Sequence, residues 1–299
     1  MLLLIRPSAF ALNAQTAVNN YFQPDKVEEN AVSIQAAALR EFDALVEALH
    51  AADIEAMVVQ DSAEPHTPDS IFPNNWVSFH EEGHVLYPMF AANRRLERAL
   101  DIWPALPPSK LLLDLSQEEN HGRFLEGTGS LVLDRSNRVA YAARSARTDE
   151  ALVKRWCEVM NYTPIVFNSM QTVDGKRLPI YHTNVMMSVG EGFALWCPSC
   201  IDDVAERERV GESLRTGNRE LIAISEEQMH SFAGNILQVF NRKNEPFILM
   251  SAAAEAALRG PALSALKHHG TILSSPIPTI ERYGGGSVRC MVAEIPANR

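Results

Sequence analysis

The feature of this 299-residue chain that most constrains its fold is a repeat of secondary-structure signals. Each copy has two short strand-like runs, a segment with helical periodicity and a third strand-like run, separated by Gly, Asp or Asn turns. The first runs begin near residues 75, 129, 183, 235 and 287, so the spacings are 54, 54, 52 and 52 residues. The period holds for the order of elements, while identical residues between copies are few.

The last copy is incomplete, and the start of the chain supplies its missing parts. The copy has one strand-like run, "SVRCMVAEI", whereas the N-terminus has a strand-like "LLLIRPS", a helical segment over residues 24–52 and a strand-like "IEAMVV". A repeat completed in this way pairs both of its edges and suggests a closed ring. The sequence therefore predicts an α/β fold, one ring of five ββαβ units with the helices outside. A two-domain doubly wound protein is the alternative.

Polar residues mark the start of the first strand-like run in every unit. Equivalent positions in a ring face one axis, so these side chains are expected to converge. A cysteine, a histidine and a carboxylate in one funnel supply a nucleophile, a base and an orienting group. Taken singly, each has an ordinary structural interpretation, such as a turn asparagine or a solvated glutamate. The residues are Asp69, Asn74, Asn75, Glu126, His182, Asn184, Asn235 and Cys290.

Three consecutive glycines, residues 284–286, precede Cys290. Glycine allows positive φ angles and lets another group approach the backbone closely. The alternative is a flexible turn that leads into a core strand, with Cys290 as a small buried apolar residue.

These segments resemble the arginine deiminase and amidinotransferase superfamily, the guanidino-group modifying enzymes. "PDSIF" resembles the aspartate-bearing strand of dimethylarginine dimethylaminohydrolases, and "GGGSVRCM" the nucleophile strand of deiminases. "MFAANRRLE" and "RSARTD" resemble the family's arginine-bearing segments. "RPSAFALNAQTAVNNYFQ" and "PDSIFPNNWVSF" are similar to the citrulline-utilisation hydrolase type. The resemblance spans the whole chain and implies a five-bladed α/β propeller with pseudo-fivefold symmetry, as a single catalytic domain over residues 1–299.

The resemblance also implies a role for each candidate residue. Cys290 attacks the trigonal carbon, His182 protonates the departing nitrogen and later activates water, and Glu126 orients His182 and favours its charged form. The substrate-binding residues are expected to hold either the planar head group or, for the arginines, an amino-acid carboxylate. They are Asp69, Asn75 and Asn184 for the head group, and Arg95 and Arg147 for the carboxylate.

The chain departs from the deiminase pattern at the residues that hold the substrate cation. Deiminases generally have aspartates where this chain has Asn75 and Asn184, and the acid of their "EGGD" has no match in "EGTGS". Amides both donate and accept hydrogen bonds, so they suit a neutral ureido group better than a guanidinium. We therefore expect a cysteine hydrolase that converts citrulline to ornithine, ammonia and carbon dioxide. Arginine deiminase or dimethylarginine dimethylaminohydrolase-like activity, an amidinotransferase and a non-catalytic binding protein are the alternatives.

Composition limits partners and cofactors. A formal net charge of −10 argues against nucleic acid, and no apolar run approaches the roughly 20 residues that span a membrane. "MLLLIRPSAF" indicates a first strand and not a signal peptide, and four cysteines form no disulfide framework, which favours the cytoplasm. "CPSC" lacks two further zinc ligands, so we expect no metal and no organic cofactor. The expected partner is a small-molecule substrate, and a homodimer is left open.

Overall fold

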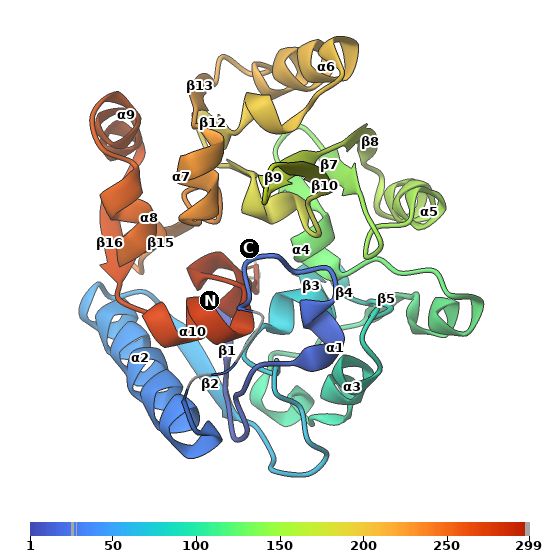
Figure 1. The fold of residues 1–299 in the computed structure, drawn as a ribbon, viewed down its shortest axis with the longest axis vertical. Coiled ribbons are helices and arrows are strands. Elements are labelled where there is room, and N and C mark those ends of the chain that lie inside the picture. Colours follow the sequence, from blue (N-terminus) through green and yellow to red (C-terminus); the bar gives the residue numbers. More distant parts are fainter. Residues whose placement is uncertain (25–26, 28, 297–299) are drawn as a thin grey trace.

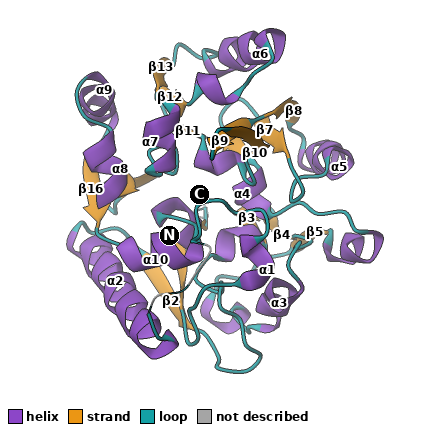
Figure 2. Cartoon of the chain, viewed as in Figure 1, coloured by secondary structure: helices purple, strands orange, loops and turns teal. Residues whose placement is uncertain are grey.

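The structure is a computed structural model that describes residues 1–24, 27 and 29–296. These residues form an α/β fold in which short mixed sheets alternate along the chain with helices, as predicted. Figure 1 shows helices α2 (Ala31–Ala51), α5 (Glu150–Met160), α6 (Val204–Leu214) and α9 (Pro261–His269) along the outer edge of the molecule in this view, with the N-terminus near its middle. The strands are distributed around the molecule and do not join in one continuous sheet (Figure 2).

Five three-stranded sheets of the described chain share one pairing pattern. In each, an antiparallel pair is followed by a parallel pair, which is the order of the predicted ββαβ unit. Every one of these sheets is open, so ring closure stays a prediction. The strands are β3 (Val77–His80), β4 (Gly83–Leu86) and β5 (Leu111–Asp114); β6 (Val132–Asp134), β7 (Val139–Arg144) and β8 (Thr163–Asn168); β11 (Met187–Val189), β12 (Phe193–Trp196) and β13 (Glu220–Ala223); β14 (Leu237–Phe240), β15 (Pro246–Ser251) and β16 (Thr271–Ser275); and β17 (Ala293–Glu294), β1 (Leu2–Arg6) and β2 (Ala56–Gln60).

The last of these sheets joins the two ends of the chain. Strand β1 runs antiparallel to β17, with Leu2 opposite Glu294, and parallel to β2, with Leu2 beside Ala56. The four residues from Leu2 to Ile5 are buried, since apolar side chains fill both faces of this central strand. The predicted completion of the last unit by the first residues is therefore confirmed.

The predicted helix over residues 24–52 is shorter in the structure. Helix α2 begins after Asn30, whose side chain accepts a hydrogen bond from the backbone of Ser33; residues 25, 26 and 28 of the predicted segment lie outside the described part. Gly260, with φ of 75°, separates α8 (Ala252–Ala257) from α9. The remaining elements are α1 (Ala14–Ala17), α3 (Ala92–Arg95), α4 (Gly127–Ser130), α7 (Glu226–His230) and α10 (Pro278–Gly284), with an unpredicted hairpin of β9 (Met170–Val173) and β10 (Lys176–Pro179).

Short helical turns occupy positions where the sequence suggested strand starts. Turns at Pro73–Asn75 and Thr183–Val185 precede β3 and β11, and α4 precedes β6. The prediction of a strand over "SVRCMVAEI" is wrong for its first part, because Val288–Met291 form a 3₁₀ turn and only β17 is extended. The Asn, Gly, Pro and Ser residues of these segments favour turns over ladders. The candidate side chains therefore project from turns and not from strands.

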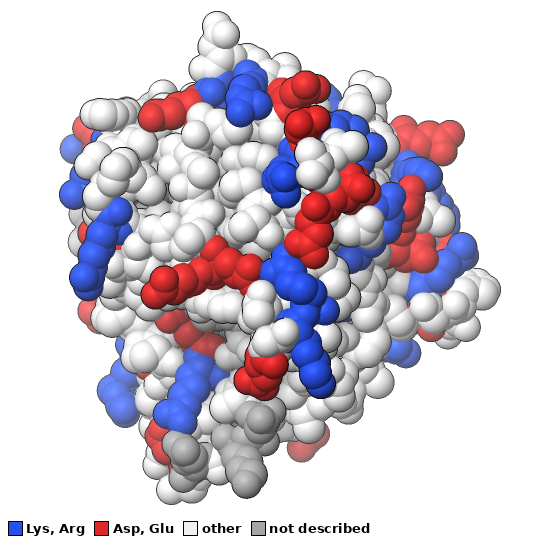
Figure 3. Space-filling view, turned by 45° about the horizontal axis from the view of Figure 1, so that its top comes forward, with Lys and Arg blue, Asp and Glu red and all other residues white. Residues whose placement is uncertain are grey.

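On the face of the molecule in Figure 3, acidic and basic side chains are interspersed. None of the described helices is both long and apolar enough to cross a membrane.

Candidate active site

A recess beside the glycine-rich turn collects most of the predicted site residues. Its empty volume is about 270 Å³. A larger cavity of about 430 Å³ lies at the β3–β4 turn, but none of the predicted site residues lines it, so size alone does not locate the site. The recess is lined by the predicted Asp69, Asn75, Arg147, His182 and Cys290, and by the unpredicted Thr16, Asn20, Phe72, Arg94, Tyr181, Gly284, Gly285 and Gly286.

The sulfur of Cys290 lies between two asparagine side chains. The Nδ2 atoms of Asn235 and Asn184 donate to Sγ at 3.3 Å and 3.6 Å. Asn184 contacts the sulfur and does not line the recess, so its predicted position at the substrate head group is corrected. The sequence placed Asn184 on a strand, whereas the Thr183–Val185 turn directs it to Cys290.

Close packing explains the three glycines. Gly285 has φ of 63°, and a Cβ at this position would lie 2.4 Å from Nδ2 of Asn20. A Cβ at Gly284 would lie 2.7 Å from the ring of Phe72. The segment is therefore a packed turn at the edge of the recess, and the alternative of a loosely held turn is wrong.

Glu126 and His182 form a buried hydrogen-bonded pair. His182 Nε2 lies 2.7 Å from Glu126 Oε2, and Arg147 Nη1 lies 3.5 Å from the same oxygen. Burial alone would raise the pKa of Glu126, but the charge of Arg147 and the bond to His182 lower this pKa to about 2. Burial lowers the pKa of His182 to about 4, although Glu126 acts in the opposite direction. Glu126 therefore favours the charged form of His182, as expected, but burial outweighs this effect and the imidazole is neutral.

The bond to Glu126 determines which nitrogen of His182 is free. A carboxylate only accepts hydrogen bonds, so Nε2 carries the proton and Nδ1 keeps a lone pair. A Cβ at Gly129 would lie 2.7 Å from Nδ1 and 2.5 Å from Asn75 Nδ2, so only glycine fits between the two side chains. The neutral imidazole can accept a proton at Nδ1.

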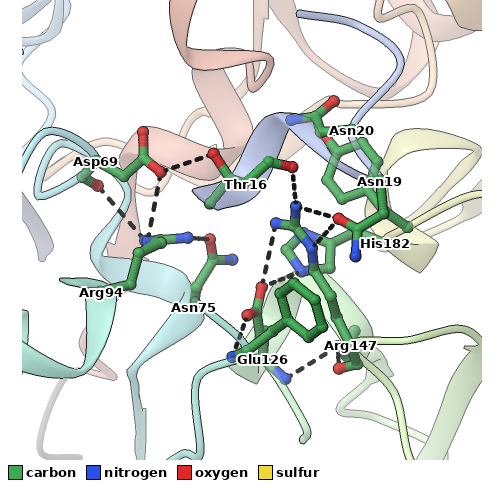
Figure 4. A network of polar contacts seen from close by, with 12 residues as sticks. Thr16, Asn19, Asn20, Asp69, Asn75, Arg94, Glu126, Arg147 and His182 are labelled. Carbon is green, nitrogen blue, oxygen red and sulfur yellow. Dashed lines mark hydrogen bonds and ion pairs between the residues drawn. The ribbon is translucent and has the colours of Figure 1, made fainter. Parts of the chain in front are cut away.

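Asp69 and Asn75 each have one unpaired polar atom beside the recess (Figure 4). Oδ2 of Asp69 accepts from Asn13 at 2.8 Å, whereas its Oδ1 has no partner in the described part of the chain. Asn75 Oδ1 accepts from Arg94 at 2.7 Å, and because arginine only donates, this bond fixes the orientation of the amide. Asn75 Nδ2 is without a partner among the described residues. A buried acceptor and a buried donor are thus available to a bound molecule.

Of the two predicted arginines, the structure brings only Arg147 to the recess. Arg147 is buried and donates to the Thr16 carbonyl at 2.8 Å. Arg95 points away and donates to the carbonyls of Met89 and Phe90. Its neighbour Arg94 lines the recess instead, because successive residues of a helix project about 100° apart. The prediction for Arg95 is therefore corrected to Arg94.

The sequence analysis missed the contribution of the N-terminal segment. Thr16 and Asn20 line the recess, Asn13 binds Asp69, and Asn19 Oδ1 accepts from Arg147 Nε at 2.9 Å. The sequence signal for this contribution is the polar run "NAQTAVNN", which in the sequence analysis supports only the family resemblance. No group of His, Cys, Asp and Glu able to hold a metal occurs within the described ranges.

Comparisons with known proteins identify the family and the fold of the chain. The family described as N,N dimethylarginine dimethylhydrolase, eukaryotic, matches residues 6–297. No curated protein matches the chain by sequence. Three solved structures share its fold.

The first is apo ArgZ, an arginine dihydrolase from the ornithine–ammonia cycle in cyanobacteria, with a TM-score of 0.75 and 16% identity over 99% of this chain. This chain covers 41% of the apo ArgZ chain, but 97% of the N-terminal domain of ArgZ bound to product, which has the same TM-score and identity. The third is a dimethylarginine dimethylaminohydrolase variant with an S-methyl-L-thiocitrulline adduct, with a TM-score of 0.66 and 14% identity over 98% of both chains.

Proposed function

Because the chain belongs to the eukaryotic N,N dimethylarginine dimethylhydrolase family, and is thus a hydrolase of non-peptide carbon–nitrogen bonds, we propose that it cleaves the guanidino group of arginine or a methylated arginine. The observation that carries the proposal is one recess lined by Cys290, His182 and Asp69, with Glu126 bound to His182. The five three-stranded sheets support a five-bladed α/β propeller in one catalytic domain. The four free thiols support a cytoplasmic location.

The proposed reaction proceeds through a covalent adduct. Nδ1 of His182 takes the thiol proton while Sγ of Cys290 bonds to the trigonal carbon. The imidazolium, held by ionised Glu126, returns the proton to the departing nitrogen, which leaves as an amine or ammonia. Water then gives a proton to His182 and its oxygen bonds to the carbon. The carbon–sulfur bond breaks, which releases a ureido product and restores the thiol.

The charges around the recess favour a cationic head group. Arg94 and Glu97 form a bidentate ion pair with distances of 2.7 Å and 2.9 Å. Arg94 Nε also lies 3.8 Å from Asp69 Oδ2, and Arg147 lies 3.5 Å from Glu126 Oε2. The three carboxylates of Glu97, Asp69 and Glu126 therefore face two guanidinium groups, and His182 is neutral. Burial raises the pKa of Asp69, so its ionised form needs a further partner, and a guanidinium offers N–H donors to the unpaired Oδ1. Arginine-type substrates are therefore placed ahead of citrulline, reversing the order inferred from the sequence.

Citrulline is a second candidate substrate because of the unpaired Nδ2 atom of Asn75. The unpaired Nδ2 of Asn75 needs an acceptor, which a guanidinium lacks and a ureido oxygen provides. Hydrolysis of citrulline by the same steps releases ammonia and then a carbamate of ornithine, whose carbon–nitrogen bond breaks to give ornithine and carbon dioxide.

The test is the value of kcat/KM for arginine, dimethylarginine and citrulline, measured by amine or ammonia release, with Cys290→Ser as the background. We expect a guanidino substrate to be preferred by the wild type, and Asn75→Asp to increase this preference by about tenfold, because a second carboxylate faces the cation. A tenfold preference of the wild type for citrulline would identify a ureido hydrolase. Dependence on an added amine would identify an amidinotransferase, and no release above background would overturn the proposal.

A further inference from the structure

The carbonyl oxygen of Gly285 accepts hydrogen bonds from two side chains of distant segments. Oη of Tyr181 donates to it at 2.5 Å, and Nδ2 of Asn20 donates to it at 3.2 Å. All three residues are buried, and all three line the recess. Tyr181 directly precedes His182 in the chain, and Gly285 lies in the turn that leads to Cys290. One carbonyl thus connects the segments that carry the base and the nucleophile.

The backbone conformation at Gly285 allows its carbonyl oxygen to accept from two donors. Gly285 ends helix α10 in the left-handed conformation, and its N–H donates to the carbonyl of Glu281 at 3.0 Å. A carbonyl oxygen has two lone pairs, so it can serve Tyr181 and Asn20 together. Loss of both donors would leave a buried acceptor unpaired, which is costlier than loss of either one.

The ring of Tyr181 is held independently of its hydroxyl. The guanidinium of Arg147 lies 5.0 Å from the ring centre, and the ring of His182 lies 4.7 Å away. Replacement by phenylalanine keeps these two contacts and removes only the bond to Gly285. The hydroxyl can therefore be tested separately from the packing of the ring.

We propose that Tyr181 and Asn20 are positioning residues that act through the Gly285 carbonyl to hold Nδ1 of His182 at the distance from Sγ of Cys290 that proton transfer requires. This inference rests on the proposed function. A misplacement of about 1 Å costs on the order of 100-fold in rate, so a small shift of the turn is enough to impair turnover.

The first test is Tyr181→Phe, with Tyr141→Phe as a matched control. Tyr141 is also buried, and its hydroxyl bonds to Ser213 at 2.8 Å outside the recess. We expect Tyr181→Phe to lower kcat by roughly 10- to 100-fold with KM changed less than about threefold. Alkylation of Cys290 by iodoacetamide should slow in parallel. Tyr141→Phe should lower the melting temperature yet leave kcat and the alkylation rate within about twofold.

The second test combines Tyr181→Phe with Asn20→Ala. Each single variant leaves Gly285 one donor, whereas the double variant leaves none, so the loss in kcat should exceed the product of the single losses by about fivefold or more. If Tyr181→Phe behaves like Tyr141→Phe, or the double loss is merely multiplicative, the positioning role is overturned. If the wild type turns over no substrate, the proposed function has failed, and the alkylation rates alone decide whether the carbonyl links the two segments.

Discussion

The pair Cys197 and Cys200 and the single Cys290 are all buried, but their surroundings differ. Cys197 and Cys200 follow strand β12, and their sulfur atoms lie 3.2 Å apart, with the Cys200 thiol donating to the Cys197 sulfur. This bond lowers the pKa of Cys197 to about 7. Cys290 instead lies between amide donors and lines the same recess as His182.

The difference shows that an acidic thiol does not by itself make a nucleophile. The Cys197 sulfur has a lowered pKa, but Cys197 and Cys200 line neither of the two cavities described above. Cys290 has room for a trigonal carbon and a neutral imidazole on the same recess. We infer that the space around a thiol, together with a proton acceptor, decides its chemistry here.

The largest contrast should come from removing the thiols in turn. Cys290→Ser is expected to lower kcat by at least about 10⁴-fold with the fold intact, because a hydroxyl is a far weaker nucleophile at neutral pH. Cys197→Ser serves as the matched control and should retain turnover within about threefold. Ammonia release and circular dichroism on both variants check this. Equal losses in the two variants would contradict the assignment of Cys290.

A smaller effect is expected from the acid–base pair that distinguishes the Cys290 site. His182→Ala should lower kcat by about 10²- to 10⁴-fold, and Glu126→Gln by about 10²-fold, since the amide holds the ring but cannot stabilise an imidazolium. Steady-state kinetics measures both, and Glu150→Gln, at the half-buried start of α5 and outside the recess, is the control for loss of a carboxylate. Near-normal turnover in His182→Ala would mean that the recess works without this base.

Burial of neutral His182 should also appear in the pH dependence of stability. Its pKa is about 4 in the folded protein and near 6.5 in the unfolded chain, so between these values only the unfolded chain binds the proton. The wild type therefore loses stability as pH falls from 6.5 to 4, by up to about 3 kcal/mol from this group. His182→Asn lacks this loss. Urea unfolding at pH 6.5 and pH 4 should show that lowering the pH reduces the free energy of unfolding of the wild type more than that of His182→Asn. An equal reduction in the two proteins would indicate that His182 is not buried in its neutral form.

The smallest change is expected at the thiol pair. Cys200→Ala removes one buried sulfur and its bond to Cys197, which should cost about 1–2 kcal/mol of stability while kcat stays within about twofold. Thermal unfolding and ammonia release on one preparation separate the two quantities. A large loss of turnover at unchanged stability would show that the pair takes part in the reaction.

The sequence predicted the repeated units and five of the residues that line the recess, because strand alternation and turn residues are local signals. The sequence did not predict the conformation of a segment or the direction of a side chain where these depend on tertiary contacts. "VRCM" is apolar enough to suggest a strand, yet the packed glycines place Val288–Met291 in a turn. Arg94 and Arg95 are adjacent in sequence, and bonds to the buried Glu97 and Asn75 direct Arg94 towards the recess. The position of Asn184 against the sulfur likewise follows from its turn and not from its spacing.

The most direct test of the account is to locate the covalent adduct. Wild-type protein is incubated with arginine, dimethylarginine or citrulline, quenched in acid within the first turnover, digested and analysed by mass spectrometry. We predict a substrate-derived mass on the peptide that contains Cys290, present also in Cys197→Ser and absent in Cys290→Ser. An adduct on Cys157, Cys197 or Cys200, or turnover in Cys290→Ser, would contradict the central claim.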